Sequence, residues 1–366
     1  MKLKLEDVCY KESSNIAQKD LEALEGEYPI YGASGFIKNI DNYKQEKDYI
    51  AIVKDGAGVG RAMLLPAKSS VIGTLQYIIP RENVNTNYLY YAISHMNLSK
   101  YANGATIPHI YFKDYKNEIF ELPSFDQQHK IVATLDQVND LISIKNQQLE
   151  QLDLLIKSRF VEMFGDPVKN EKGWETKELQ FVSKVGSSKR FYQEELSISG
   201  VPFLKIADIL NRIDNKETEA NTYISEEQYL ELLKLNLVPK ENDVLVTSRG
   251  TIGKCYIVSK NDKFYFQDGM ITWLSNFAKY LSPIFIFYSF MMNGIRNQIN
   301  SMQAGSTVAY LSIAMIKKLN IMLPPLALQT QFADFVEQVE RTKDSMKQSL
   351  EQLETLKKKL MQDYFG

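Results

Sequence analysis

A long internal repeat constrains the fold of this chain more than any other feature of its sequence. When the 366-residue sequence is shifted by 201 positions, residues 104–165 align with residues 305–366 without a gap, and 17 of the 62 aligned residues are identical. The run LEQL occurs at Leu149–Leu152 and again at Leu350–Leu353. A period of about 200 residues is far longer than the repeat of a solenoid protein. The repeat therefore predicts a duplicated pair of domains.

The similarity continues toward the N-terminus with a smaller offset. Gly60 in DGAGVGRAMLL aligns with Gly253 in SRGTIGKCYIV at an offset of 193, and Leu5 aligns with Leu179 at an offset of 174. The second copy therefore carries about 27 additional residues in its first part. We interpret the chain as two homologous halves that have diverged in their globular parts and stayed in register in their helical parts.

Each half opens with short apolar runs of β type that are separated by turn residues. A buried helix is expected to follow these strands in each half. The predicted strands are Asp48–Val53, Ser69–Ile79, Asp243–Ser248 and Lys263–Leu274, and the predicted buried helices are Tyr88–Met96 and Pro283–Met292. This pattern predicts an α+β domain with a mixed or antiparallel sheet in each half.

Each half is expected to close on a long helix. Pro123 interrupts the preceding chain, Ser124 is a candidate N-cap, and Gln127 completes a capping-box pattern. Apolar residues then recur in alternating steps of four and three residues over nearly five heptads, which favours a coiled coil. A single helix over Asp126–Met163 would contain 38 residues and measure roughly 57 Å.

We expect the two long helices to pack on each other. The predicted interface residues are Leu135, Val138, Leu149, Leu152, Val336, Val339, Leu350 and Leu353, and charged residues interrupt this seam at Lys145, Arg159, Lys343 and Lys357. Antiparallel packing would place the two globular domains at opposite ends of a rod. The alternative is that each helix packs only on the surface of its own domain.

These elements predict an α+β chain in which two homologous domains are joined by two antiparallel coiled-coil helices. The predicted segments are a first globular domain (1–123), a first spacer helix (124–165), a linker (166–172), a second globular domain (173–325) and a second spacer helix (326–366). The linker DPVKNEKG is charged and contains Pro and Gly, which is typical of a turn between elements.

Composition excludes some classes of protein. The 43 Lys and Arg residues and 45 Asp and Glu residues give a formal charge of −2, so the chain is not a strongly basic protein that coats nucleic acid. The N-terminus lacks the apolar region of a secretory signal, and the apolar run Tyr280–Met292 is too short to span a bilayer. Cys9 and Cys255 show no disulfide or metal-site spacing. We expect a cytoplasmic protein.

No motif in the sequence predicts catalysis. GTIGKC (Gly250–Cys255) lacks the glycine spacing and the hydroxyl residue of a phosphate loop. GAGVG (Gly56–Gly60) differs from a dinucleotide-binding fingerprint and leads into another β-type run instead of a helix. The three histidines lack metal-ligand spacing. We therefore expect a binding protein with no catalytic residue, no metal and no cofactor.

Polar and basic residues gather around the glycine-rich turns and the repeated glycines Gly104 and Gly305. Loops that carry Lys, Arg, Ser and Thr on a rigid scaffold suit contacts to DNA phosphates and base edges. The alternative for any one of these residues is a solvated surface position. The candidate DNA-binding residues are Ser34, Lys54, Arg61, Thr106, His109, Ser187, Ser188, Lys189, Arg190, Ser248, Arg249, Thr251, Lys254, Thr307 and Tyr310.

Four stretches, in this order and within the duplicated layout, resemble the specificity subunit of type I restriction–modification systems. They are YPIYGASGFIKNIDNY (Tyr28–Tyr43), VKDGAGVGRAMLLPAKSSVIGTLQYI (Val53–Ile78), ATIPHIYFKDYKNEIFELPSFDQQHKI (Ala105–Ile131) and STVAYLSIAMIKKLNIMLPPLALQTQF (Ser306–Phe332). The second half departs from the first, because it lacks YPIYGASG and has the longer stretch Val201–Ile224 instead. Its base contacts are therefore undefined by the resemblance.

The resemblance implies a two-headed reader of double-stranded DNA. Each globular domain would be a target-recognition domain for one half of a split, asymmetric sequence, and the two helices would be the spacer between the halves. Such a subunit would hold two methyltransferase subunits that methylate adenine and would recruit restriction subunits. With roughly 57 Å helices and a DNA turn of about 34 Å, the two major-groove contacts would lie one to one-and-a-half turns apart.

Two other functions are compatible with the sequence pattern. One is a coiled-coil scaffold whose two heads bind proteins and no DNA. The other is an enzyme that binds a nucleotide at the Gly56–Gly60 turn. Salt dependence would separate DNA binding from the scaffold, because phosphate contacts make log affinity fall linearly with log salt.

Overall fold

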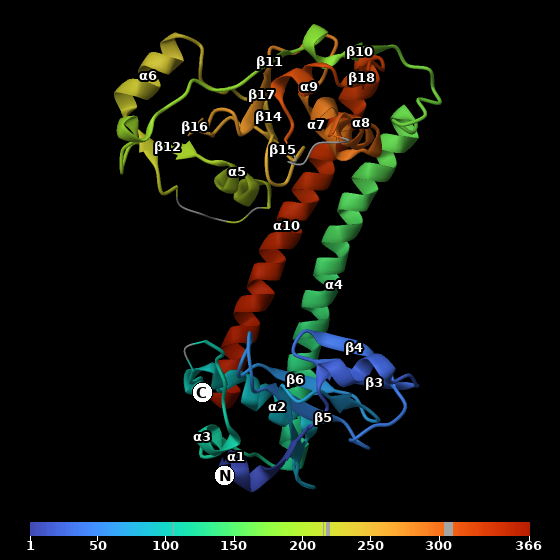
Figure 1. Cartoon of the computed structure of the whole chain (residues 1–366), viewed down its shortest axis with the longest axis vertical. Coiled ribbons are helices and arrows are strands. Elements are labelled where there is room, and N and C mark those ends of the chain that lie inside the picture. Colours follow the sequence, from blue (N-terminus) through green and yellow to red (C-terminus); the bar gives the residue numbers. More distant parts are fainter. Residues whose placement is uncertain (105, 215, 217–219, 304–309) are drawn as a thin grey trace. The chain divides into compact units, whose positions relative to one another are not determined.

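The computed structural model describes residues 1–104, 106–214, 216, 220–303 and 310–366. It divides into two compact units (Figure 1). Unit 1 consists of Met1–Gln147 and Met346–Gly366, and unit 2 consists of Gln148–Ser345. No helix in the described part of the chain is both long and apolar enough to cross a membrane.

Unit 1 contains three small sheets. Strands β1 (Lys2–Lys4) and β9 (Ile119–Glu121) form an antiparallel pair. The second sheet has four antiparallel strands in the order β2 (Cys9–Ser13), β8 (Leu75–Pro80), β5 (Tyr49–Val53) and β6 (Ala62–Leu65). In the third sheet, β3 (Tyr28–Gly32) pairs antiparallel with β4 (Gly35–Ile40) and parallel with β7 (Ser70–Val71). The helices of this half are α1 (Leu5–Val8), η1 (Gln18–Ala23), α2 (Thr86–His95), η2 (Leu98–Tyr101), α3 (Phe112–Tyr115) and α4 (Phe125–Phe164).

Unit 2 repeats the same three sheets. Strands β10 (Thr176–Glu178) and β18 (Asn320–Met322) pair, and the four-stranded sheet has the order β11 (Lys184–Gly186), β17 (Ile271–Ser275), β14 (Val244–Thr247) and β15 (Cys255–Ile257). In the third sheet, β12 (Val201–Leu204) pairs antiparallel with β13 (Tyr223–Ile224) and parallel with β16 (Tyr265–Phe266). Every strand of unit 2 thus has a counterpart in unit 1, which confirms the predicted duplication and the α+β class.

The described helices of unit 2 are η3 (Leu179–Phe181), η4 (Gln193–Glu195), α5 (Ile206–Ile213), α6 (Glu226–Lys234), α7 (Pro283–Met291), α8 (Asn293–Gln303), α9 (Ile313–Lys317) and α10 (Leu326–Phe365).

Two of these helices, α5 and α6, lie in the part of the second half that is longer than the first half. Helix α5 lies between β12 and β13, and α6 lies between β13 and β14. Neither has a counterpart among the described elements of unit 1. The stretch Val201–Ile224 therefore contains β12 and β13, which correspond to β3 and β4 of unit 1, and adds helix α5 between them.

Two strand predictions were too long. Ser69–Ile79 is two strands, β7 and β8, which belong to different sheets, and Lys263–Leu274 is likewise divided into β16 and β17. The chain turns between the strands of each pair, at Gly73 and at Gly269. Gly269 has a φ of +69°, a conformation that glycine adopts without strain. The predicted strands at Asp48–Val53 and Asp243–Ser248 and both buried helices are present as β5, β14, α2 and α7.

Helices α4 and α10 each contain 40 residues, so each is roughly 60 Å long at 1.5 Å per residue. The predicted capping box of α4 is present, because the Ser124 amide donates to Gln127 Oε1 and the Gln127 amide donates to Ser124 Oγ. In unit 1 the first part of α4 packs with the last part of α10, and in unit 2 the last part of α4 packs with the first part of α10. The two helices therefore run antiparallel, as the sequence predicted.

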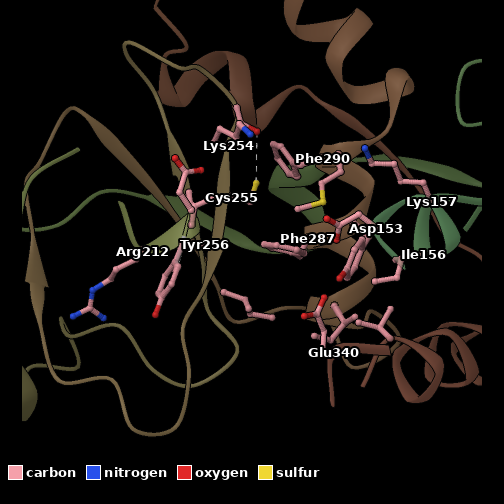
Figure 2. Close-up of a pocket in the computed structure, with 18 of the residues that line it drawn as sticks. Asp153, Ile156, Lys157, Arg212, Lys254, Cys255, Tyr256, Phe287, Phe290 and Glu340 are labelled. Carbon is pink, nitrogen blue, oxygen red and sulfur yellow. Dashed lines mark hydrogen bonds between the residues drawn. The ribbon is translucent and has the colours of Figure 1, made fainter. Parts of the chain in front are cut away.

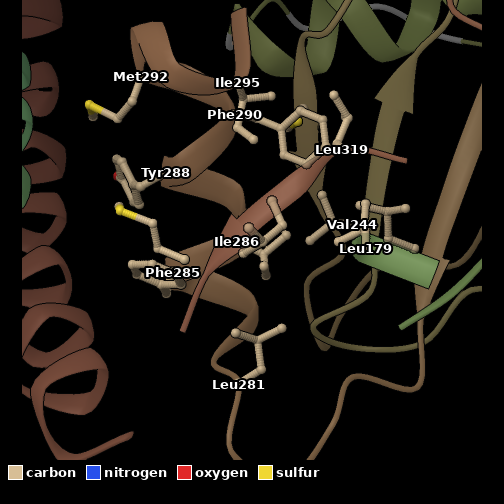
Figure 3. Packing of buried hydrophobic residues seen from close by; sticks show 14 of the residues in the cluster. Leu179, Val244, Leu281, Phe285, Ile286, Tyr288, Phe290, Met292, Ile295 and Leu319 are labelled. Atoms are coloured by element: carbon tan, nitrogen blue, oxygen red, sulfur yellow. The ribbon is translucent and has the colours of Figure 1, made fainter. Parts of the chain in front are cut away.

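Each long helix ends in the core of the unit that contains the other helix's start. Phe365, at the end of α10, lies 5.2 Å from the Tyr88 ring of α2 in unit 1. The equivalent Phe164, at the end of α4, lies 4.8 Å from the Phe285 ring of α7 in unit 2 and is fully buried. Figure 3 shows Phe285 and neighbouring α7 side chains packing with the unit 2 core. The repeated Phe-Gly ending thus completes the core of each unit.

One buried glutamine fixes the first turn of each long helix. In unit 1, Gln128 accepts a hydrogen bond from the Asn85 amide at the start of α2 (2.8 Å) and donates to the carbonyls of Asn83 and Pro123. In unit 2, Gln329 accepts from the Ser282 amide at the start of α7 (2.7 Å) and makes the matching donor bonds. The two glutamines are aligned in the repeat and are almost fully buried.

The predicted seam residues differ in burial. Leu135, Val138, Val336 and Val339 are buried, and Leu149, Leu152, Leu350 and Leu353 are half-buried. Among the charged exceptions, Lys343 on α10 pairs with Asp153 on α4 at 2.7 Å and with Glu340 at 2.9 Å. Burial alone would lower the pKa of Lys343, but the two carboxylates raise it above its usual value. That the two helices form a continuous coiled-coil interface stays a prediction. The predicted domain boundaries at residues 123, 165, 172 and 325 also stay predictions.

Replacing Gln329 by Ala should destabilise unit 2 by about 1–3 kcal/mol, because the Ser282 amide and two carbonyls would lose their buried partner. Both tryptophans, Trp174 and Trp273, belong to unit 2, so their fluorescence during denaturant unfolding measures this loss. Gln338→Ala is the control, because Gln338 is exposed on the same helix. Equal unfolding midpoints for the two variants would contradict the role of the buried glutamine.

Removing the aromatic ring at the end of a long helix should lower the free energy of unfolding more in unit 2 than in unit 1. Phe164→Ala creates a cavity at a fully buried position, for which about 3–5 kcal/mol is expected, whereas Phe365 is half-buried and should cost less. Tryptophan fluorescence measures the first variant. Hydrogen exchange of the α2 amides, which Phe365 covers through Tyr88, measures the second. Unchanged α2 exchange in Phe365→Ala would show that α10 does not complete the unit 1 core.

Candidate DNA interface

In unit 1, the β5–β6 turn is bonded to the segment that follows the repeated Gly104. The Gly56 amide donates to the Pro108 carbonyl (2.9 Å), and the Ile110 amide donates to the Lys54 carbonyl (2.9 Å). Asp55 and His109 form an antiparallel bridge. The candidates Lys54, Arg61, Thr106 and His109 therefore lie on two adjoining loops.

The β3–β4 hairpin turn joins the same group of loops. The Arg61 guanidinium donates a hydrogen bond to the Ala33 carbonyl, and Ser34 is exposed beside this contact. Lys54 is held by Asp55 at 3.5 Å. Gly60 has a φ of +86°, and a Cβ there would lie 2.5 Å from the Ser99 backbone nitrogen, so the turn requires glycine. All five unit 1 candidates are thus brought together, with Ser34 and Thr106 exposed.

Unit 2 builds the equivalent turn with the same backbone bond. The Leu311 amide donates to the Ser248 carbonyl (2.9 Å), as Ile110 does to Lys54. The Ser248 hydroxyl is buried and lies 2.9 Å from the Thr272 hydroxyl, so it supports the turn and does not face solvent. Arg249 and Thr251 are exposed on the turn itself.

Arg249 stacks on Tyr310. Its guanidinium carbon lies 4.9 Å from the centre of the Tyr310 ring, a cation–π distance that restrains an otherwise mobile side chain. The backbone bond between Leu311 and Ser248 holds Tyr310 beside the turn. The candidate Thr307 lies outside the described residues.

The basic loop Ser187–Arg190 adjoins the same turn through the β16–β17 connection. The Ser187 hydroxyl donates to the Ile271 carbonyl (3.1 Å), and the Lys189 amide donates to the Tyr265 hydroxyl (2.6 Å). Arg190 pairs with Asp268 at 2.9 Å, and this bond raises the pKa of the guanidinium. The Ser188 hydroxyl oxygen is buried and has no hydrogen-bond partner among the described residues.

The Ser248 amide completes this arrangement by donating to the Met270 carbonyl at 2.8 Å, so both basic loops of unit 2 meet at residues 268–271. Lys254 is the exception. It lines a cleft with residues that include Lys157, Arg212 and Tyr256 (Figure 2). The structure therefore places Lys254 beside the long helices as well as at the end of the turn.

Some residues at these loops escaped the sequence reasoning. Phe36 follows the hairpin turn and is 60% exposed, and Ile107 follows Thr106 and is 63% exposed. Large apolar side chains at such positions can meet thymine methyl groups or base faces. Their position next to glycine-rich turns could have marked both residues as candidates in the sequence. The sequence could not indicate the role of Asp268, because its salt bridge with Arg190 joins residues 78 positions apart.

No group of three or more His, Cys, Asp or Glu residues in the described part of the chain is arranged to hold a metal ion. The two cysteines are buried, and burial raises the pKa of both thiols, that of Cys9 to about 12. Such thiols stay protonated and are poor nucleophiles.

A family model for the type I restriction modification DNA specificity domain matches residues 1–154 and 171–355. The chain belongs to this family. It is a DNA target-recognition subunit of a type I restriction–modification complex, which is a specificity subunit and not a catalytic one. The resemblance in the sequence is thereby confirmed, and the scaffold without DNA and the nucleotide-binding enzyme are excluded.

Two relatives are similar over most of this chain. One is described as a type I restriction enzyme specificity subunit of Haemophilus influenzae and is 24% identical over 92% of this chain and 87% of its own length. The other, the MjaIX type I restriction enzyme specificity subunit of Methanocaldococcus jannaschii, is 25% identical over 71% of this chain and 63% of its own length.

Solved structures share the fold. The crystal structure of a type I restriction–modification S subunit from M. genitalium matches all of this chain and 96% of that chain, with a TM-score of 0.62 at 15% identity. A chain from a structural study of complex assembly and conformational transition of the type I R-M system also matches all of this chain and 97% of its own, with a TM-score of 0.59 at 14% identity.

Arg249→Ala should weaken binding of the assembled type I complex to its target DNA by about 1–3 kcal/mol, because a restrained guanidinium suits base or phosphate contacts. Fluorescence anisotropy at fixed salt measures the change. Arg341→Ala is the matched control, because Arg341 is exposed on α10 and paired only with Glu337 among the described residues. Equal affinities for both variants would remove Arg249 from the interface.

Proposed function

We propose that each unit reads one half of a split, asymmetric DNA sequence, and that α4 and α10 form the spacer that sets the gap between the halves. The observation that carries this proposal is a repeated scaffold with divergent loops. Both units have the same three sheets and the same backbone bond at the turn, Ile110 to Lys54 and Leu311 to Ser248. The side chains around that turn differ between the units.

The differences bear on what each unit would read. Lys54 in unit 1 is replaced by the buried Ser248 in unit 2, and the two-residue hairpin turn after β3 is replaced by a connection that contains α5. A basic loop at Ser187–Arg190 adds charge in unit 2. Hydrogen bonds and apolar contacts at base edges depend on such side chains, so two different loop sets suit two different half-sites.

The exposed candidates would make the contacts, and the buried ones would hold the loops. The exposed candidates that would meet phosphates or base edges are Ser34, Arg61, Thr106, Lys189, Arg190, Arg249 and Thr251. Ser248 would act through the shape of its turn. The formal charge of −2 fits modest binding by this subunit alone, with partner subunits adding phosphate contacts.

The partners we propose are two adenine methyltransferase subunits and the restriction subunits of the complex. Membership of the family supports assembly into a type I complex, and the internal repeat supports two equivalent positions for one kind of partner. Since the target of the complex is DNA, we also propose a cytoplasmic location.

Methylation mapping tests the reading function. We expect this chain, expressed with its methyltransferase subunit in a host without DNA methylation, to direct methylation of adenines in both halves of a split motif. Replacing residues 1–123 by the corresponding segment of a relative should change one half only, and replacing residues 173–325 should change the other. Sequencing of modified adenines reads out each case.

The exchanges act as controls for each other, because each leaves one half of the motif as an internal reference. A palindromic motif, or a change in both halves after a single exchange, would contradict one reading unit per half-site. Absence of methylation from a complex that is verified to assemble would contradict the proposed positioning of the methyltransferases.

A further inference from the structure

An ion pair joins the basic loop of unit 2 to the connection between β16 and β17. Arg190 Nε donates to Asp268 Oδ2 at 2.9 Å. The side chain of Arg190 is 64% exposed and that of Asp268 is 20% exposed, so a largely buried carboxylate holds an exposed guanidinium. Because Asp268 takes the Nε–H, it does not occupy the outer edge of the guanidinium, which carries the two terminal nitrogens.

Hydrogen bonds on both sides of the ion pair fix the backbone segments that carry it. The Gly269 amide donates to the Ser187 hydroxyl at 3.2 Å. The Lys189 amide donates to the hydroxyl of Tyr265 at 2.6 Å, and the Tyr265 side chain is fully buried. The two segments are therefore held against each other, and the place of the guanidinium is determined by the backbone as well as by the carboxylate.

Unit 1 joins the corresponding segments without charged side chains. At the offset of 174, Ile16 aligns with Arg190. Gly73 and Asp268 each follow by two residues the strand that pairs parallel with β3 or with β12. The Gly73 amide donates to the Ile16 carbonyl at 2.7 Å. Since these segments meet in unit 1 through a backbone bond, the ion pair of unit 2 is not a requirement of the shared scaffold.

An exposed arginine on a DNA-binding loop can contact a phosphate or a base, and the carboxylate of Asp268 favours the base. A phosphate is attracted mainly by charge, and this carboxylate lowers the net positive charge that a nearby phosphate would meet. The same carboxylate restricts the orientation of the guanidinium plane. A bidentate contact to guanine O6 and N7 in the major groove depends on that orientation, and it is the commonest specific contact between proteins and DNA bases.

We propose that Arg190 reads a guanine in the half-site of unit 2 through its two terminal nitrogens, and that Asp268 is the positioning residue that holds it for this contact. Unit 1 reads no guanine with this part of its scaffold, because Ile16 and Gly73 occupy the two places. The inference deepens the proposed function and rests on it, because it assumes that unit 2 reads one half of a split sequence.

Methylation mapping of the unaltered complex is the first test. The half-motif that changes when residues 173–325 are exchanged is the one that unit 2 reads, and we expect it to contain an invariant G·C pair. Each invariant G·C pair of this half-motif is then replaced by the other three base pairs. Fluorescence anisotropy with the assembled complex measures discrimination as the ratio of affinities for the original and the replaced duplexes.

Replacing Arg190 should relax the motif at one G·C pair. For Arg190→Ala we expect the discrimination at that pair to fall by roughly 5- to 150-fold, with methylation appearing at sites that carry another base pair there. Arg190→Lys keeps the positive charge but removes the planar fork. It should reduce the discrimination while the slope of log affinity against log salt stays unchanged.

Replacing Asp268 separates positioning from a purely structural role. Asp268→Ala frees the guanidinium and raises the local positive charge, so discrimination at the same G·C pair should fall while affinity for DNA without the motif should not. Asp268→Asn keeps an oxygen that can accept from Nε and should retain the discrimination. Tryptophan fluorescence during unfolding checks the fold of each variant, since Trp174 and Trp273 both lie in unit 2.

Arg341→Ala is the matched control. Arg341 pairs with Glu337 on α10 and is exposed, so the variant removes an arginine–carboxylate pair from unit 2 outside the candidate loops. The motif and the discrimination at each G·C pair should stay as in the unaltered complex.

Three results would overturn the inference and leave the proposed function standing. The first is a unit 2 half-motif without an invariant G·C pair. The second is an Arg190→Ala complex that binds every duplex more weakly by one common factor, which would make Arg190 a phosphate contact. The third is unchanged discrimination in a folded Asp268→Ala complex. Absence of a split motif from an assembled complex would contradict the proposed function itself and the inference with it.

Discussion

The hydrogen bonds of two buried glutamines determine how each long helix leaves its unit. Gln128 and Gln329 each join the first turn of a helix to the start of the buried helix α2 or α7 and to the carbonyl before the helix begins. If one of these buried amides lost its partners, its N–H donors and its carbonyl oxygen would be left without hydrogen bonds, which is unfavourable in a buried site. Apolar contacts do not depend on direction in this way. The direction of the first turn of each long helix is therefore fixed by hydrogen bonds within its own unit, and apolar packing along the helix adds to it.

The exchange of helix ends explains why the same ending occurs twice. Phe365 completes the core around Tyr88, and Phe164 completes the core around Phe285. Each ending therefore has to fit the domain of the other copy. Divergence of one ending would leave a cavity in the opposite unit, so packing keeps both endings alike. The exposed side chains of the loops, such as Thr106, Arg249 and Thr251, are under no such packing constraint.

The sequence predicted the elements that local pattern determines. Heptad spacing and the Ser124–Gln127 capping box were enough for α4, and apolar runs were enough for β5 and α7. It did not predict that Ser69–Ile79 would divide between two sheets, because strand pairing depends on partners such as Tyr31 and Ala51 that are distant in the sequence. For the interface, glycine turns located the right loops, but the burial of Ser248 depends on Thr272, which no local pattern indicates.

The agreement and the differences between the two copies follow from two separate requirements on one duplicated chain. Packing requires the copies to agree, and agreement is found at Phe164 and Phe365 and at Gln128 and Gln329. The proposed reading of an asymmetric sequence requires the copies to differ, and they do differ in the loops that a shared backbone bond holds in place. Under the proposed function, a scaffold that separates these requirements changes its DNA target through its loops without changing the cores, because the residues that do each task are on different elements.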